Sequence, residues 1–496
     1  MKSLQVALFL AAALRAASDP CATISSSLSP DAKVYYPNST EYTLAIEHWL
    51  LSSIQQPQCV VEPSSAQDIA AILKTVNATK TPFAVKGGGH ASNVGFSSTT
   101  GVHISLAQFN HTRLDASAKT VAIGGGTKWI SVYTTLDGTG FNVVGGRNPS
   151  VGVGGFTLGG GTFTGYSWKS NAHGLAIDNL VQVSIVLPDG TATTASATSH
   201  PDLFFALKGG FNNFGVVTEF TFRAIPQDLV FGGHLSYAAA DLAAVNAAVV
   251  AFEQNNTDTR AAVVHGITGL PAGNGTFAAP VAAVQLFYDG PTLPEGMFSD
   301  FFAIPAVSST WDGPITFLNW SGTDGGVSSL RGVFHAFSTL PHTPEFLQDV
   351  ADEVSAFGNE LGNKSAVYLS VAIEPFMKTA LSNNNATSRS SAYPPVRSPV
   401  LLPSNIFFGY LDATEDATMH AAIAQIQANI VAKAQARGLI YPESKGGSIY
   451  SNYALAGTDG AHVIDFYGPA HLAQLRSVRA KFDPDSVMKL AGGWKV

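Results

Sequence analysis

The sequence has few charged residues and lacks any basic run. Only 12% of its 496 residues are charged, the formal net charge is −8, and no five consecutive residues are basic. A protein that binds nucleic acid or an anionic membrane surface presents a basic patch, so we expect neither partner. Hydrophobic residues make up 46% of the chain, which excludes a disordered protein. A chain of this length is expected to form two or three domains.

Long apolar runs are also missing. Lys2, the mostly apolar residues 4–14 and the small residues 16–18 predict a signal peptide over residues 1–18. A buried N-terminal helix is the alternative. No later stretch of about 18 uninterrupted apolar residues occurs, so we expect no transmembrane helix. These features indicate a secreted protein.

Cysteine is scarce, with only Cys21 and Cys59 in the chain. An exported protein folds in an oxidising compartment, so we expect a disulfide between the two. They do not make a zinc site alone, and we expect no metal. Possible glycan sites, which support secretion only weakly, occur at Asn38, Asn77, Asn110, Asn255, Asn274, Asn319, Asn363 and Asn385.

Hydrophobic periodicity divides the chain into two parts. Residues 31–227 mix short helices and strands with glycine-rich corners. We expect helices over 63–78 and 129–136, and strands over 83–85, 102–106, 121–123, 180–187, 191–195 and 215–223. Residues 228–445 carry longer elements. We expect helices over 241–252, 345–358 and 417–437, strands over 281–288 and 366–373, and a loop over 380–404. A last helix is expected over 472–482.

Two glycine-rich segments are candidates for ligand binding. The first, KGGGHAS at 86–92, follows a predicted strand, and its glycines allow a turn whose N–H groups bind a diphosphate. It has neither the P-loop nor the Rossmann spacing. His90 could be a ligand, a base, a covalent attachment point or a structural histidine. The second, GVGGFTLGGG at 152–161, has six glycines in ten residues, so we expect a linker or a packed loop rather than a helix.

Two further segments complete the pattern: LKGGFNNFGVV at 207–217, and YSNY at 450–453 with FDP and GGWK after it. In this order the four segments resemble flavin-dependent oxidoreductases of the vanillyl-alcohol-oxidase/p-cresol-methylhydroxylase (PCMH) type, most closely the berberine-bridge-enzyme-like family of the secreted fungal kind. The resemblance covers about residues 31–227 and 440–496. It implies an α+β fold with an FAD-binding PCMH-type domain at 31–227. A separate substrate domain of sheet and helices follows at 228–445, and the C-terminal segment 446–496 returns to the first domain.

The resemblance implies FAD as cofactor, bonded covalently through His90 to the 8α-methyl group of the isoalloxazine ring. Many members add a second bond through a Cys. Asn148 stands at that position here, so a single link is implied. The residues implied to bind FAD are Lys86, Gly87, Gly88, Gly89, His90, Ala91, Ser92, Gly95, Phe96, Ser97, Val151, Gly154, Gly155, Leu158, Gly159, Gly160, Gly161, Asp178, Asn179, Val217 and Asn452.

The implied reaction is a two-electron oxidation of a small organic substrate, with O2 as acceptor. Val151 resembles the residue of oxygen-permissive members, which favours an oxidase over a dehydrogenase. A singly attached flavin favours a small or flat substrate, an alcohol, amine or secondary metabolite, bound between the domains. A carbohydrate oxidase, a redox-silent flavoprotein and a cofactor-free glycoprotein are the alternatives. We expect a monomer.

The catalytic base does not carry over from the family. Plant members place a Glu or Gln on a substrate-domain strand, and the corresponding region 405–410 has no carboxylate. Tyr410, Tyr450 and Tyr453 are the candidates, because a phenol with a lowered pKa could take a substrate proton. Packing in the core or against FAD is the alternative role for each. Residues 162–165 look like an insertion relative to the family.

Overall fold

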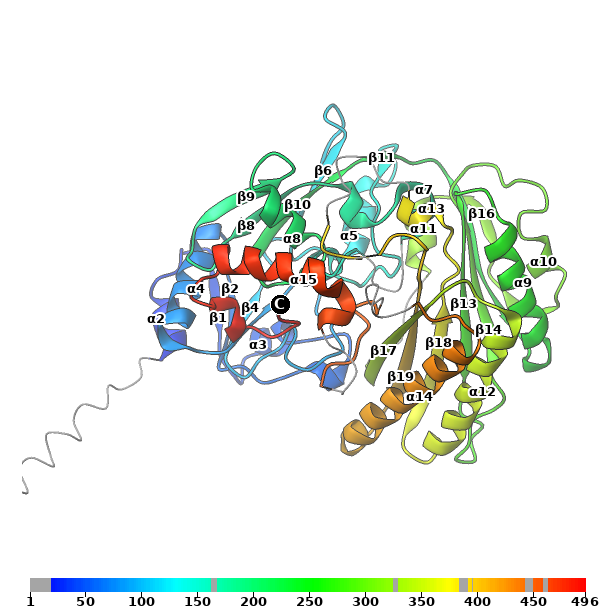
Figure 1. The fold of residues 1–496 in the computed structure, drawn as a ribbon. Helices are drawn as coiled ribbons and strands as arrows, with labels where there is room; N and C mark the ends of the chain where they lie inside the picture. The colour runs from blue at the N-terminus through cyan, green and yellow to red at the C-terminus, as the bar shows by residue number, and fades with distance from the viewer. Residues whose placement is uncertain are drawn as a thin grey trace, which may run out of the picture.

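The computed structural model describes residues 19–161, 167–323, 329–382, 391–394, 396–441, 449–457 and 463–496. The predicted signal peptide, the insertion at 162–165 and the Asn385 sequon lie outside these ranges. Two bodies of sheet and helix lie side by side (Figure 1), one formed by the strands up to β11 and the other by a single large sheet. The predicted α+β fold class is confirmed.

A four-stranded sheet opens the first body. It consists of β1 (Lys33–Tyr35), β2 (Cys59–Glu62), β4 (Val102–Ser105) and β3 (Phe83–Lys86), in that order. The helices α2 (Pro20–Ser25) and α4 (Ala66–Thr79) share a core with it. Ser65 caps α4, and the apolar face predicted for this helix is buried. The predicted Cys21–Cys59 disulfide is present and ties α2 to β2.

A five-stranded antiparallel sheet completes this body. Its strands, in order, are β5 (Thr112–Asp115), β6 (Thr120–Gly124), β10 (Val216–Arg223), β8 (Leu180–Val186) and β9 (Ala192–Ser196). The helices α5 (Trp129–Leu136) and α8 (Pro201–Leu207) share its core. The strands β7 (Phe141–Asn142) and β11 (Ile225–Pro226) form a separate pair.

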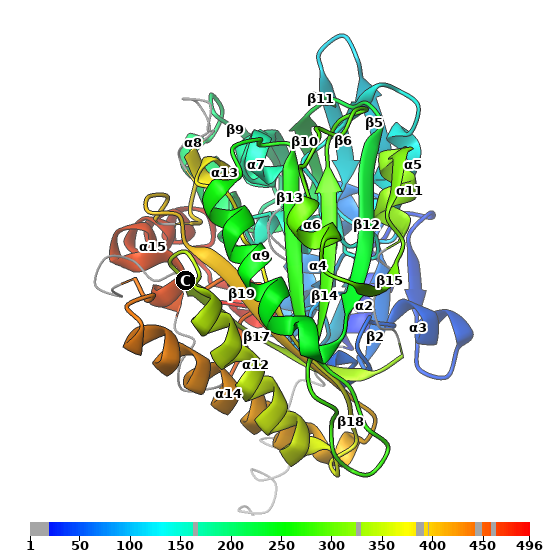
Figure 2. The same ribbon diagram turned by 90° about the vertical axis from the view of Figure 1, so that its right-hand side faces the viewer.

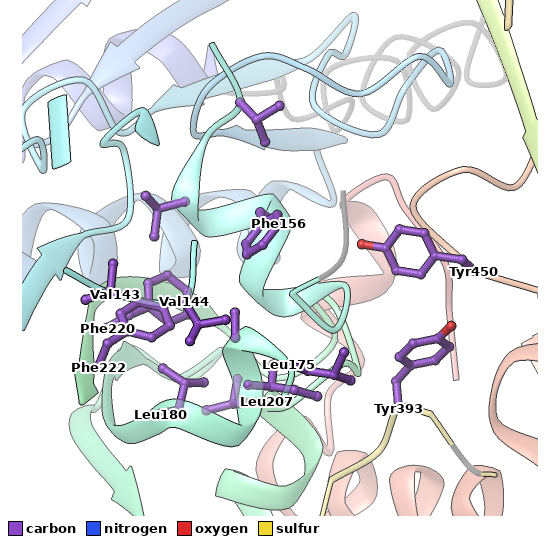
Figure 3. Packing of buried hydrophobic residues seen from close by; sticks show 14 of the residues in the cluster. Val143, Val144, Phe156, Leu175, Leu180, Leu207, Phe220, Phe222, Tyr393 and Tyr450 are labelled. Atoms are coloured by element: carbon purple, nitrogen blue, oxygen red, sulfur yellow. The ribbon is translucent and has the colours of Figure 1, made fainter. Parts of the chain in front are cut away.

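The glycine-rich segment 152–161 contains a short helix, α6 (Val153–Leu158), so the expectation of no helix was wrong. Glycine in a helix costs about 1 kcal/mol relative to alanine. Burial of Val153 and Phe156 in the main core offsets that cost. Figure 3 shows Phe156 on α6 in this cluster, with Tyr393 and Tyr450 to one side. Tertiary packing therefore overrides the local preference.

The second body is built on an eight-stranded antiparallel sheet. Its strands are β12 (Val230–Tyr237), β13 (Ala261–Gly269), β14 (Val281–Tyr288), β15 (Ala306–Ser309), β16 (Asp312–Ile315), β17 (Arg331–Thr339), β18 (Ala366–Ile373) and β19 (Leu402–Tyr410). The order is β15-β12-β14-β13-β18-β19-β17, and β16 pairs with β12. The helices α9 (Leu242–Asn255), α12 (Pro344–Leu361) and α14 (Asp416–Ala436) cover one face (Figure 2).

Strand alternation decides which side chains face the first body. On β13, Val263 and Ile267 pack under the helices, whereas Val264, Gly266 and Thr268 point to the opposite face. That opposite face lies against the first body (Figure 1). The large sheet thus presents one row of residues from each central strand to the boundary between the bodies.

The chain ends in the first body. Helix α15 (Val463–Phe482), drawn in red in Figure 1, packs on α8, and the short helix η7 (Val487–Leu490) contacts α4. The remaining short helices are α3 (Thr40–Ala45), α7 (Ser170–His173), α10 (Ser299–Phe302), α11 (Phe317–Gly322), α13 (Thr379–Ser382), η2 (Leu51–Ser53), η3 (Ala176–Asn179), η4 (Ala239–Asp241) and η5 (Ala413–Glu415). Among the described residues, no helix combines the length and apolarity needed to cross a bilayer.

Candidate functional site

A cavity lies inside the first body. All four segments singled out in the sequence contribute to its wall. The predicted FAD-binding residues that line it are Gly87, Gly88, Gly89, His90, Ala91, Ser92, Phe96, Ser97, Val151, Gly154, Gly155, Leu158, Val217 and Asn452. The fold therefore brings segments more than 350 residues apart to one concave site, which is the usual form of a cofactor pocket.

Glycines give this cavity its shape. A Cβ on Gly88 would lie 2.5 Å from the Gly152 Cα, so the first loop and the start of α6 approach as closely as backbones can. A Cβ on Gly154 would lie 2.6 Å from the Gly125 carbonyl oxygen. Gly155, in contrast, faces open space within the cavity wall. A long, partly flat cofactor such as FAD fits a cavity walled by bare backbone in this way.

Several implied FAD-binding residues do not line the cavity. The Lys86 Nζ donates to the Ala45 carbonyl oxygen at 2.8 Å, and burial lowers the pKa of Lys86 to about 8. Gly95 lies beside the cavity rather than in its wall. Gly159, Gly160 and Gly161 make room for Asn452, Tyr393 and Ala176 respectively, because a Cβ on each would clash with these side chains.

Asp178 and Asn179 are also occupied elsewhere. Arg397, from the second half of the chain, binds both carboxylate oxygens of Asp178 at 2.9 and 3.0 Å. The Asn179 Nδ2 donates to the His173 and Leu175 carbonyl oxygens. Both residues hold the chain around η3 and neither lines the cavity.

Some lining residues were not among the predicted ones. Asn93, Phe211, Asn212 and Gly493 line the cavity. The last three lie within the glycine-rich segments already singled out in the sequence, so their position in these segments could have predicted them. Asn93 lies between the implied FAD-binding residues Ser92 and Gly95. Its own contacts were not predictable, because its side chain bonds the Ala454 carbonyl oxygen and the Ala456 N–H, which only the folded chain brings near.

His90 lies where two cavities meet. It lines both the first cavity and a second one. Its imidazole stacks on Trp49 with ring centroids 4.2 Å apart, and its Nε2 lies 3.0 Å from the Ser150 Oγ. Burial lowers the pKa of His90 to about 3, so the ring is neutral at physiological pH.

The second cavity lies between the two bodies and has a mixed wall. Aromatic rings of Trp49, Phe334, Tyr368 and Phe407 form one part. The face of the large sheet that is turned toward the first body supplies a row of polar groups: His234, Ser236, Thr268, Gln285, Ser370 and Asn405. Such a wall stacks a flat molecule on one side and hydrogen-bonds it on the other.

A buried ion pair adjoins this cavity. The Arg147 Nη2 lies 2.8 Å from the Glu374 Oε1, and both side chains are almost fully buried. Arg147 also lies over the Trp168 ring and lines the second cavity. The Tyr453 hydroxyl lies 3.3 Å from the same Glu374 oxygen. The pair therefore joins the two bodies beside the cavity.

The three candidate tyrosines are in different surroundings. On β19, Asn405 and Phe407 face the second cavity, so Tyr410 faces the helices, where its hydroxyl donates to Asp416 at 2.7 Å. The Tyr450 hydroxyl accepts from the Asn452 Nδ2. Tyr453 lies beside Glu374. Burial raises the pKa of Tyr410 and Tyr453, so neither of these two phenols has the lowered pKa that would suit a base.

The architecture and the cavity define a flavin-binding oxidoreductase of the PCMH type. Residues 57–196 match the FAD binding domain family. The solved structure of 6-hydroxy-D-nicotine oxidase from Arthrobacter nicotinovorans superposes with a TM-score of 0.75 at 19% identity, over 93% of this chain and 97% of that one. A glucooligosaccharide oxidase from Acremonium strictum superposes with a TM-score of 0.76 at 18% identity, over 95% and 96%.

Sequence relatives establish the family. The chain is 32% identical to FAD-dependent monooxygenase FUP4 of Fusarium proliferatum, over 89% of this chain and 85% of the relative. It is 30% identical to FAD-dependent monooxygenase drtC of Aspergillus calidoustus, over 97% and 91%. The chain belongs to the FAD-dependent oxidoreductases of the PCMH and berberine-bridge-enzyme family.

Proposed function

We propose that this protein is an oxidase with FAD in the first cavity, attached through His90, and a small flat substrate in the second. The position of His90 in the walls of both cavities is the observation that carries the proposal. When bound, FAD supplies the two-electron oxidation and passes the electrons to O2. The protein supplies binding, orientation and proton transfer.

The aromatic and polar walls of the second cavity support a flat substrate carrying oxygen or nitrogen groups. Trp49, Phe334 and Phe407 would stack on it, and the polar row of the sheet would bind its edge. Tyr453, whose ring stacks on Phe334 of the cavity wall, is the proposed proton acceptor. Its hydroxyl can pass a proton to Glu374 at 3.3 Å, and this coupling does not need a lowered phenol pKa.

Two other outcomes compete with this proposal. The curated relatives are named monooxygenases, which would place one oxygen atom of O2 in the product. The solved glucooligosaccharide oxidase favours a sugar substrate. The polar row of the second cavity also suits hydroxyl groups, so a carbohydrate belongs in any substrate screen.

Secretion and a single covalent link are part of the proposal. The Cys21–Cys59 disulfide supports folding in an oxidising compartment. Asn148, at the position that a second cysteine link would need, bonds Ser150 instead. The sequons supply possible glycan sites.

A test without a known substrate uses the flavin itself. The purified protein should be yellow, and its colour should stay with the acid-precipitated pellet, whereas His90→Ala should release it. After anaerobic photoreduction, air should restore the colour within seconds and form one H2O2 per O2 consumed. Slow recovery in air, with rapid recovery on adding a quinone, would instead identify a dehydrogenase. Oxygen uptake with alcohols, amines, phenols and sugars then identifies the substrate. Formation of less than one H2O2 per O2 consumed with that substrate would indicate a monooxygenase.

A further inference from the structure

A short hydrogen-bonded series connects Asn148, Ser150 and His90. The Ser150 Oγ lies 2.6 Å from the Asn148 Oδ1 and 3.0 Å from the His90 Nε2. The Ser150 backbone N–H donates to the same Asn148 oxygen at 2.9 Å. Asn148 and His90 are both buried, so water does not compete freely for these contacts.

The direction of each bond follows from the donors present. An atom that receives a backbone N–H must be an acceptor, so the Asn148 atom beside Ser150 is its carbonyl oxygen. The Ser150 hydroxyl has one proton, and it points to that oxygen. The hydroxyl therefore meets the imidazole with a lone pair, and Nε2 must carry the proton. In a neutral imidazole the other nitrogen, Nδ1, then holds the lone pair.

We propose that Asn148 and Ser150 are positioning residues for cofactor attachment: they fix the His90 tautomer that presents Nδ1 as the nucleophile. This inference rests on the proposed covalent link. It adds which residues hold the imidazole in its reactive form. Stacking on Trp49 holds the plane of the His90 ring. The hydrogen bond between Nε2 and Ser150 then fixes the direction in which Nδ1 points within that plane.

The attachment balances as follows. The new bond joins Nδ1 to the 8α carbon and replaces one 8α C–H bond and the Nε2–H bond. The two protons and two electrons of this exchange pass to the flavin ring, and O2 removes them as H2O2. Nε2 then lacks a proton, and Ser150 can turn its hydroxyl to donate to it. A hydroxyl is needed because it can accept before the reaction and donate after it.

The test measures attachment separately from FAD binding. Apoprotein produced under riboflavin limitation is mixed with FAD, and acid-stable flavin is followed over time against total bound flavin. Ser150→Ala should bind FAD but attach it about tenfold more slowly, the effect of losing one hydrogen bond. Ser150→Thr, which keeps the hydroxyl, should attach at close to the wild-type rate. Asn148→Ala should also slow attachment, because the freed Ser150 proton would turn to Nε2 and favour the wrong tautomer.

The outcomes are distinguishable. Attachment of FAD to Ser150→Ala and Asn148→Ala at the wild-type rate would overturn the inference. If Ser150→Ala fails to bind FAD, the same comparison is made with Asn148→Ala, whose slower attachment supports it. Wild-type protein without acid-stable flavin would overturn the proposed link itself. Peptide mass spectrometry of the attached flavin identifies His90 as its carrier.

Discussion

Two buried histidines of this protein, His90 and His103, differ in their contacts. His90 has a hydrogen bond to Ser150 and a stacking partner in Trp49. His103, on β4, is fully buried, and neither of its ring nitrogens has a hydrogen-bond partner among the described residues. Burial lowers the pKa of both to about 3. His90 lies in the wall of the cofactor cavity, whereas the burial of His103 only lowers the stability of the folded protein at acidic pH.

His103 should therefore make folding sensitive to acid. Its folded-state pKa lies below the ordinary value of 6.5. The unfolded chain thus binds more protons between pH 6.5 and 3, and stability falls as pH falls through this range. Between pH 7.5 and 5 this one residue should cost about 2 kcal/mol. His103→Leu should lose less stability than wild type over that interval, as thermal unfolding of apoprotein at the two pH values would measure. An equal loss in both proteins would contradict the assignment.

The formation of helix α6 depends on its tertiary contacts. Its glycines allow the backbone at Gly152 to lie against Gly88, and its buried residues Val153 and Phe156 hold it in place. The element therefore forms one wall of the first cavity while contributing little helix preference of its own.

Single glycine-to-alanine substitutions in α6 or at its N-cap, Gly152, should separate the packing of this element from its place in the cavity wall. Gly152→Ala would place a Cβ 2.3 Å from the Gly88 N, so the backbone must move and stability should fall by about 1–3 kcal/mol. Gly155→Ala meets no atom within 4 Å but projects into the cavity, so the apoprotein should remain stable and bind FAD more weakly. Gly322→Ala, also in open space but on α11, is the matched control. Thermal unfolding and flavin titration would separate the three, and an unaltered melting temperature in Gly152→Ala would refute the close approach.

Sequence patterns predict elements well where periodicity and burial agree. The strands expected over 281–288 and 366–373 have these bounds in β14 and β18, because their alternating apolar residues fill the core under the helices. For α6 the composition pointed away from a helix, since the compensating contacts come from residues distant in sequence. The cavity wall was predicted largely from resemblance. The Arg147–Glu374 pair was not, because 227 residues separate its members.

At the scale of the whole molecule, contacts between the two bodies define the second cavity. Trp49 from the first body stacks on Phe407 from the second, and the Ser52 hydroxyl donates to the Gly332 carbonyl oxygen at 2.7 Å. Arg147 and Glu374 add a charged contact in the same boundary. These contacts fix the distance between the sheet and His90.

Breaking the charged contact should destabilise the protein strongly. Arg147→Met leaves the Glu374 carboxylate buried without its cation, which should cost about 3–5 kcal/mol. The double variant Arg147→Met/Glu374→Leu removes both charges and should regain much of this loss. Urea unfolding of the wild type, Arg147→Met, Glu374→Leu and the double variant gives the coupling between the two sites. Additive effects would show that the pair does not couple the two bodies.

The last residues of the chain complete the cofactor cavity. Gly493 lines it, the Trp494 indole N–H donates to the Ser451 carbonyl oxygen at 2.9 Å, and the Asn213 side chain holds the Trp494 carbonyl oxygen. This wall is the last part of the cavity to be synthesised, so the pocket is complete only once residues 493 and 494 have been made and have folded back onto the first body.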